Sequence, residues 1–222
     1  MGTPDGRERE PEPGPEPGGR AWFTSRLRLQ AFSDGVMAIA ITLSVLSIDV
    51  PTGLSSANVG HAIAGLIPDV LTYLLSFAVV GLFWLGHHAI VDRVTRVDRT
   101  LLMLNLCFLA FISLVPVVTE LMNREALSGL TVVCYATVMA LAAASELAMW
   151  LHADRAGLVD EAVTRDERSY RLFRLLTVVA VFALSIPIAF ASPTWAELFW
   201  ILIPLRPLYL GITHRRRTRA PG

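Results

Sequence analysis

The sequence contains no lysine, only two cysteines and few charged residues of any kind. All nineteen basic residues are arginines, and charged residues make up 17% of the 222 positions. Together with 54% hydrophobic residues and a mean hydropathy of +0.54, this argues against a soluble protein and is typical of a chain that crosses a membrane several times. Cys107 and Cys134 lie within apolar runs, so we expect small buried side chains rather than a disulfide.

Motifs for catalysis and for metal binding are also missing. The sequence has no HExxH motif, no phosphate-binding loop and no evident nucleophile–base pair. His87 and His88 are neighbours, but successive helical residues diverge by about 100°, so the two cannot easily face one metal ion. We therefore expect no enzyme activity, metal site, cofactor or nucleic-acid partner. A TVGYG potassium filter is absent too, which excludes ion selectivity by carbonyl rings of that type.

The first twenty residues lack hydrophobic periodicity and consist largely of proline, glycine and glutamate. This composition cannot bury enough apolar surface to offset the entropy of ordering, so residues 1–20 are predicted to form a disordered cytoplasmic tail. No apolar run precedes Trp22, so we do not expect a signal peptide. A basic cytoplasmic tail is predicted at 214–222, with the membrane domain between the tails, at 21–213.

Six apolar stretches are long enough to cross a bilayer, which predicts an all-α, polytopic membrane fold. The sixth is the weakest, because Pro204, Arg206 and Pro207 interrupt it. A short helix is expected between the first two spans, around 58–67. The predicted spans are 31–50, 70–89, 101–121, 126–151, 172–191 and 195–212.

The arginines predict how the chain is oriented in the membrane. In a six-span arrangement, eighteen of the nineteen lie on one side, and only Arg124 lies on the other. Loops rich in arginine remain on the cytoplasmic side. Both termini are therefore predicted to be cytoplasmic, in a multi-pass protein of the cell's inner (plasma) membrane.

Polar residues occur at one predicted depth on the first three spans. Asp34 lies near the start of the first span, where an unpaired charge costs a few kcal/mol or more. Trp84 lies near the inner end of the second span, and Asn105 one turn into the third. Taken singly, Trp84 is typical of an interfacial belt and Asn105 of a helix-packing hydrogen bond. Their common depth favours a buried polar network.

Apolar residues form a line along the first span. At about 100° per residue, Ile39, Leu43 and Leu46 fall at positions i, i+4 and i+7, with Thr42 beside them. Asp34 points away from this line. Periodicity alone favours ordinary lipid-facing or packing residues, because an apolar stripe in an apolar helix carries little information.

The head of the first span resembles a known family. Residues 28–34, RLQAFSD, are similar to the R-x-x-x-F-S-D signature that opens the first helix of the TMEM175 family of potassium channels. The following GVMAIAITLSVLSIDV resembles the continuation in prokaryotic members. The resemblance extends through Trp84, His88, Asn105 and Pro116, and so covers most of the chain.

This resemblance implies a potassium-permeable channel whose pore is lined by the first helix. By similarity, the hydrophobic constrictions would be Ile39, Leu43 and Leu46, and Thr42 would supply the hydroxyl associated with ion selectivity. Family members with two six-helix repeats assemble as dimers, so a single six-helix unit implies a homotetramer in the lipid bilayer. The resemblance also strengthens the predicted structural network, whose members are Arg28, Phe32, Ser33, Asp34, Trp84, His88 and Asn105.

A proton-coupled secondary transporter is the alternative that these residues leave open. Its candidate proton carriers are Asp34, His88 and Glu146, because titratable groups within membrane spans often serve that purpose. Neither an internal repeat nor a pair of glycine-broken helices is evident, and both are typical of transporters.

The predicted topology can be tested with single cysteines introduced at Thr52, Ser128 and Thr218, after Cys107 and Cys134 have been replaced by alanine. We expect a membrane-impermeant thiol reagent to label positions 52 and 128 in intact cells, and position 218 only after lysis. Labelling of position 218 from outside would contradict the topology.

Overall fold

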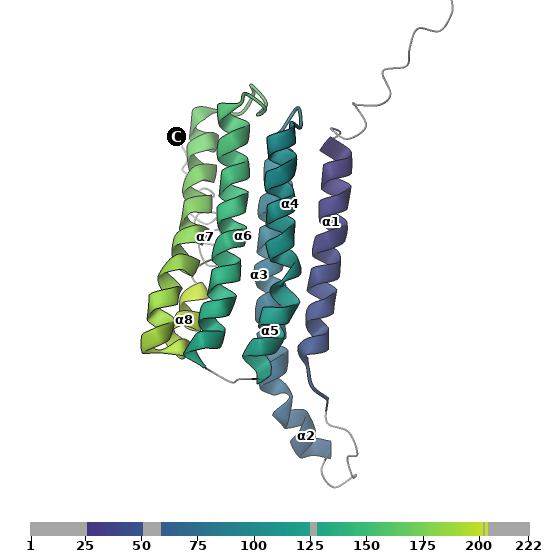
Figure 1. The fold of residues 1–222 in the computed structure, drawn as a ribbon, viewed down its shortest axis with the longest axis vertical. Coiled ribbons are helices and arrows are strands. Elements are labelled where there is room, and N and C mark those ends of the chain that lie inside the picture. The colour runs from purple at the N-terminus through teal and green to yellow at the C-terminus, as the bar shows by residue number, and fades with distance from the viewer. Residues whose placement is uncertain (1–25, 51–58, 125–127, 202, 204–222) are drawn as a thin grey trace, which may run out of the picture.

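The computed structural model describes residues 26–50, 59–124, 128–201 and 203. Within these ranges the long helices run side by side along the long axis of the molecule (Figure 1). Apart from one isolated bridged pair, every regular element in the described ranges is a helix, which confirms the all-α prediction. The two predicted tails, and most of the sixth predicted span, lie outside the described residues.

Among the described residues, five segments are long and apolar enough to cross a membrane. The short helix expected between the first two spans is present as α2, and α8 extends from just before the predicted sixth span into its first part. The elements are α1 (Arg26–Leu43), the 3-10 turn η1 (Ser44–Ser47), α2 (Val59–Gly65), α3 (Ile67–Val91), α4 (Arg99–Ser113), α5 (Val115–Arg124), α6 (Gly129–Arg155), α7 (Arg165–Ala191) and α8 (Pro193–Trp200).

Two helices begin at capping residues that lie outside their apolar stretches. The Thr164 hydroxyl accepts a hydrogen bond from the Glu167 amide at 3.2 Å, so α7 begins at Arg165 rather than at the predicted residue 172. Asp98 caps α4 in the same way, accepting from the Leu101 amide at 2.7 Å. Hydropathy misses such turns because their residues are polar.

The third predicted span, 101–121, is divided into α4 and α5. Pro116 has no amide hydrogen to give to the carbonyl of Ile112, and its ring displaces that carbonyl. The helix therefore breaks at Leu114, whose amide bonds to Phe111 at 3.1 Å, and resumes as α5.

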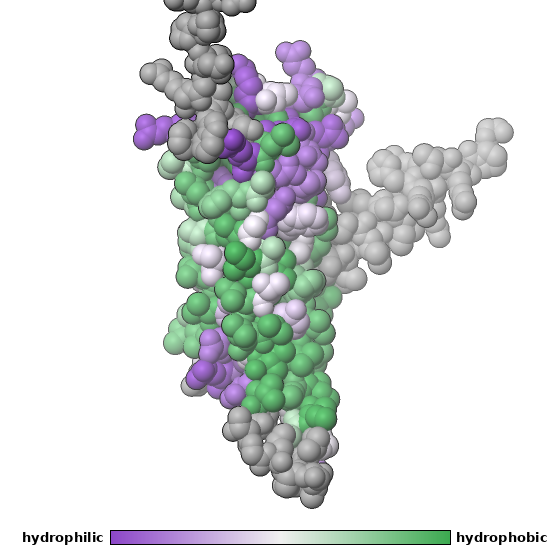
Figure 2. Space-filling model, turned by 90° about the vertical axis from the view of Figure 1, so that its right-hand side faces the viewer, coloured by the Kyte–Doolittle hydropathy of each residue, from purple (hydrophilic) through white to green (hydrophobic). Residues whose placement is uncertain are grey.

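The loops after α3 and α6 bind each other at the arginine-rich end of the molecule. The Thr95 amide donates to the Leu158 carbonyl, and the Asp160 amide donates to the Arg93 carbonyl, each at 2.8 Å. His152 bonds the Asp98 carboxylate at 2.7 Å. Burial raises the pKa of Asp98, but its hydrogen bonds from the α4 amide and His152 hold it below the usual value. Polar residues gather at this end, above an apolar middle (Figure 2).

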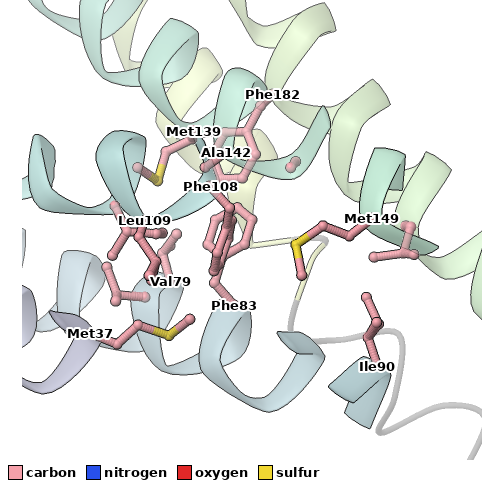
Figure 3. Packing of buried hydrophobic residues seen from close by; sticks show 14 of the residues in the cluster. Met37, Val79, Phe83, Ile90, Phe108, Leu109, Met139, Ala142, Met149 and Phe182 are labelled. Carbon is pink, nitrogen blue, oxygen red and sulfur yellow. The ribbon is translucent and has the colours of Figure 1, made fainter. Parts of the chain in front are cut away.

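Aromatic, aliphatic and small side chains fill the core. The Phe83 ring packs near the rings of Phe108 and Phe182, with centroid distances of 6.1 and 6.3 Å (Figure 3). Helix α6 packs most extensively, against α7 and α4, and small residues such as Ala136 and Ala142 on its buried face permit this approach. Because lipid offers no hydrophobic driving force between helices, such close packing has to supply their association.

Gly129 of α6 lies close to the backbone of α7, and its replacement is a test of this packing. A Cβ atom there would lie 2.8 Å from the Ala189 carbonyl oxygen, a backbone atom that cannot move cheaply. We expect Gly129→Ala to destabilise the purified protein by about 1–3 kcal/mol in thermal or denaturant unfolding. Gly81→Ala on α3 is the control, because its Cβ would meet nothing within 4 Å. Equal stability of the two variants would contradict this packing.

Candidate channel-lining helix and its polar anchor

Helix α1 has one buried face and one exposed face. It lies at an edge of the described bundle and packs against α3 and α4 (Figure 1), with Ser33, Met37 and Ala40 among its buried residues. The three predicted constriction residues lie on the opposite, exposed face. In the single chain the exposed fraction is 59% for Ile39, 46% for Leu43 and 74% for Leu46. An apolar face this open requires lipid or another subunit against it.

Thr42 lies on the same exposed face. Its hydroxyl hydrogen is directed to the backbone of its own helix, with the Ala38 and Ile39 carbonyls at 2.9 and 3.0 Å from the oxygen. A hydroxyl that donates to its own helix keeps its lone pairs free to accept. Thr42 therefore presents an oxygen acceptor between Ile39 and Leu43.

The C-terminal end of α1 tightens into the 3-10 turn η1. At three residues per turn, residues three apart lie one above the other, so η1 helps to keep Leu46 on the same side as Leu43. The turn is tied to α5, because the Asn123 amide donates to the Ser47 carbonyl at 3.0 Å. Asp49 follows the turn and is exposed.

A fully buried polar cluster joins α1 to α3 and α4. It consists of Ser33, His87 and Asn105, one from each helix. The Asn105 amide nitrogen donates to the Ser33 hydroxyl at 3.0 Å, and that hydroxyl donates to the Leu29 carbonyl at 2.8 Å. The Asn105 oxygen lies 2.7 Å from His87 Nε2, which must carry the hydrogen because the oxygen can only accept. The cluster anchors the N-terminal half of α1.

A second group lies between α1 and α3, closer to the surface. The Trp84 indole donates to the Asp34 carboxylate at 2.7 Å, which holds this carboxylate toward α3. Gln30 Nε2 lies 2.8 Å from His88 Nδ1, and His88 Nε2 lies 3.3 Å from the Asp92 carboxylate. The Trp84–Asp34 and Gln30–His88 bonds join α1 to the C-terminal half of α3, and the His88–Asp92 contact lies within the end of α3 itself.

The structure thus divides the seven predicted network residues instead of joining them in one network. His87, not His88, bonds Asn105, because one residue's rotation of about 100° turns His87 into the bundle and His88 toward Gln30. Sequence reasoning missed both His87 and Gln30 as partners. The helical spacing of α3 could have identified His87, because it lies on the same face as the apolar Val80, Phe83 and Ile90, which are buried. Phe32 and Arg28 are exposed on α1.

Comparison with known proteins places these helices in a family. Residues 28–116 match the sequence model of the family described as endosomal/lysosomal potassium channel TMEM175. A potassium channel of Streptomyces collinus is 35% identical over 170 residues, which cover 74% of this chain and 82% of that one. The chain belongs to the TMEM175 family. The match to the family model contains all but the first two residues of α1, the whole of α3 and α4, and every residue of the two polar groups.

Further relatives agree with this membership. A potassium channel of Chamaesiphon minutus is 35% identical over 169 residues, covering 71% of this chain and 83% of its own. The crystal structure of a lysosomal potassium-selective TMEM175 homolog from the same organism superposes with a TM-score of 0.69 at 26% identity, over 88% of this chain and 98% of that one. The TMEM175 chain is accordingly a multi-pass membrane protein of a channel family, not an enzyme. The human endosomal/lysosomal proton channel TMEM175 is 36% identical over 141 residues, which cover 27% of its length.

Removing Asn105 tests the anchor. Asn105→Leu leaves the buried His87 N–H without an acceptor, which we expect to lower the free energy of unfolding by about 1–3 kcal/mol. Gln30→Leu is the control, because the half-buried His88 can replace its lost bond with water. The measurement is the temperature at which each purified variant loses its single gel-filtration peak. Equal melting temperatures of the two variants would contradict a structural role for the buried cluster.

Proposed function

We propose that four copies of this chain assemble around a common axis and form a potassium-permeable channel in the plasma membrane, with both termini in the cytoplasm. Helix α1 of each copy faces the axis. The observation that carries the proposal is the exposed apolar line of Ile39, Leu43 and Leu46 on an edge helix of a chain from a channel family.

Oligomerisation follows from the position of α1. One helix at the edge of one bundle cannot enclose a pore, and the polar anchors on its other face leave only the apolar side free for contact. Four copies related by a rotation bring four such faces together, as closed cyclic symmetry permits. The resemblance to two-repeat channels that form dimers supports the same number of six-helix units.

Conduction through this pore depends on partial loss of the hydration shell. Rings of isoleucine and leucine offer no oxygen to an ion, so the barrier at Ile39, Leu43 and Leu46 comes from narrowness and dewetting. Potassium holds its water less tightly than sodium and crosses such a gap at lower cost. The Thr42 oxygens lie beside the narrow region, and their free lone pairs partly replace lost water.

Asp34 and His88 have structural roles in this proposal. Trp84 holds the Asp34 carboxylate toward α3, and His88 of α3 bonds Gln30 of α1, so both groups are engaged between α1 and α3 and not on the pore line. The transporter alternative would require a proton path that links them to Glu146. Glu146 lies on α6 near Arg174 of α7, and no hydrogen bond among the described residues connects it to Asp34 or His88.

Substitution of the innermost constriction tests the pore assignment. Ile39→Asn wets the narrow gap, so we expect a higher potassium conductance and a potassium-to-sodium permeability ratio closer to one. The measurement is single-channel recording of purified protein in planar bilayers under bi-ionic conditions. A proton gradient applied in the same preparation reports proton permeation.

Leu176→Asn on α7 is the matched control. Leu176 is 45% exposed and lies on the helix at the opposite edge of the bundle, so the same polar change there should leave conductance and permeability ratio unaltered. If both variants assemble and Ile39→Asn also conducts like the wild type, another helix lines the pore and the proposal fails.

A further inference from the structure

A cavity of about 160 Å³ lies between α3, α6 and α7, on the side of the bundle away from the α1 line. It forms because α6 and α7 pack closely together whereas α3 approaches them only lightly. Leu85 and Tyr170, which line the cavity, are also exposed, so the cavity opens on the outer surface of the described helices. The opening thus faces away from the described helices.

Two charged side chains from different helices converge inside this cavity. Glu146 of α6 is only 3% exposed, and its Oε1 has no hydrogen-bond partner among the described residues. A Cβ atom at Gly86 of α3 would lie 2.3 Å from this oxygen and 2.7 Å from Nη2 of Arg174, so the missing side chain makes the space for both groups. A buried carboxylate oxygen without a partner is costly, and a donor brought by a ligand would remove that cost.

The cavity lining changes from polar to apolar with depth. Arg174 is the last charged residue of α7, since 175–191 carries no charge, and Tyr170 lies one turn nearer the arginine-rich end. Both are typical of the level where headgroups meet acyl chains. Leu82 of α3 and Phe182 of α7 line the deeper part. This order, with polar groups above apolar ones, is the order of a phospholipid in the adjoining leaflet.

We propose that this cavity binds one phosphatidylethanolamine molecule. The lipid ammonium donates to the Glu146 carboxylate, the lipid phosphate accepts from the Arg174 guanidinium, and the upper part of an acyl chain lies along Leu82 and Phe182. The pair of opposite charges in the cavity matches the pair in this zwitterionic headgroup. Phosphatidylcholine has no N–H donor for Glu146, and phosphatidylglycerol would bring a net negative headgroup to a buried carboxylate.

The site is independent of the proposed pore and is tested by binding, not by ion flux. The full-length protein, purified as its native oligomer in detergent, is mixed with equal amounts of phosphatidylethanolamine, phosphatidylcholine and phosphatidylglycerol of identical acyl chains and examined by native mass spectrometry. We expect the phosphatidylethanolamine adduct to exceed the phosphatidylcholine adduct about tenfold, as one charge-assisted hydrogen bond allows.

Variants assign this preference to the cavity. Gly86→Ala, which fills the space between the charges, and Glu146→Gln, which removes the carboxylate charge, should each reduce the preference to about one. Gly81→Ala on the same helix should keep it, because its Cβ meets no atom within 4 Å. If Gly86→Ala does not fold, Arg174→Gln, at a half-buried position, is the second cavity variant, and it should weaken the phosphatidylethanolamine and phosphatidylcholine adducts alike because both lipids carry the phosphate.

Several outcomes would overturn the assignment. They are equal phosphatidylethanolamine and phosphatidylcholine adducts on the wild type, a stronger phosphatidylglycerol adduct, and a preference that persists in both cavity variants. Absence of any lipid adduct would also refute it, and would leave a further segment of the chain, or a neighbouring subunit, as the group that covers Glu146.

Discussion

The buried hydrogen bonds among Ser33, His87 and Asn105 are the interaction on which the arrangement of α1 depends. They join three helices at one point, inside an apolar bundle where an unmet polar group is expensive. Because each donor and acceptor has a direction, the bonds fix the rotation of α1 about its own axis as well as its position. Apolar packing alone would permit several rotations of so uniformly hydrophobic a helix.

Because that rotation is fixed, one face of α1 packs in the bundle and the opposite face is exposed. The face with Ser33, Met37 and Ala40 is committed to the bundle, and the Trp84–Asp34 bond holds the one acidic side chain of α1 toward α3. The opposite face carries only apolar residues and one hydroxyl in the region of Ile39 to Leu46. A polar anchor on one side thus leaves an apolar face on the other, and in the proposed channel this arrangement keeps charge out of the narrow part of the ion path.

The class of fold, and the three helices that the polar residues join, were predictable from the sequence. The exact ends of the helices and one hydrogen-bond partner were not. Length and hydropathy located five of the spans, because bilayer thickness sets a helix length that composition reveals. They did not reveal the polar first turn of α7, which depends on the Thr164 cap, or the break before Pro116. Choosing between His87 and His88 as the partner of Asn105 required the rotation of α3 about its own axis, because neighbouring helical residues point about 100° apart. The Glu146–Arg174 cavity depends on the spacing of three helices and has no local sequence signal.

In the proposed channel, the exposed line of α1 faces the conduction path. The most direct test is to introduce Leu46→Cys into protein in which Cys107 and Cys134 are alanine, and to record potassium current while a membrane-impermeant, thiol-reactive cation is applied from the outer side. Leu46 is 74% exposed and lies at the C-terminal end of the line, which the predicted topology places at the outer side. We expect a rapid and irreversible block of the current through the Leu46→Cys variant, and no effect on the cysteine-free protein. A current that persists while mass spectrometry shows position 46 fully modified would contradict it.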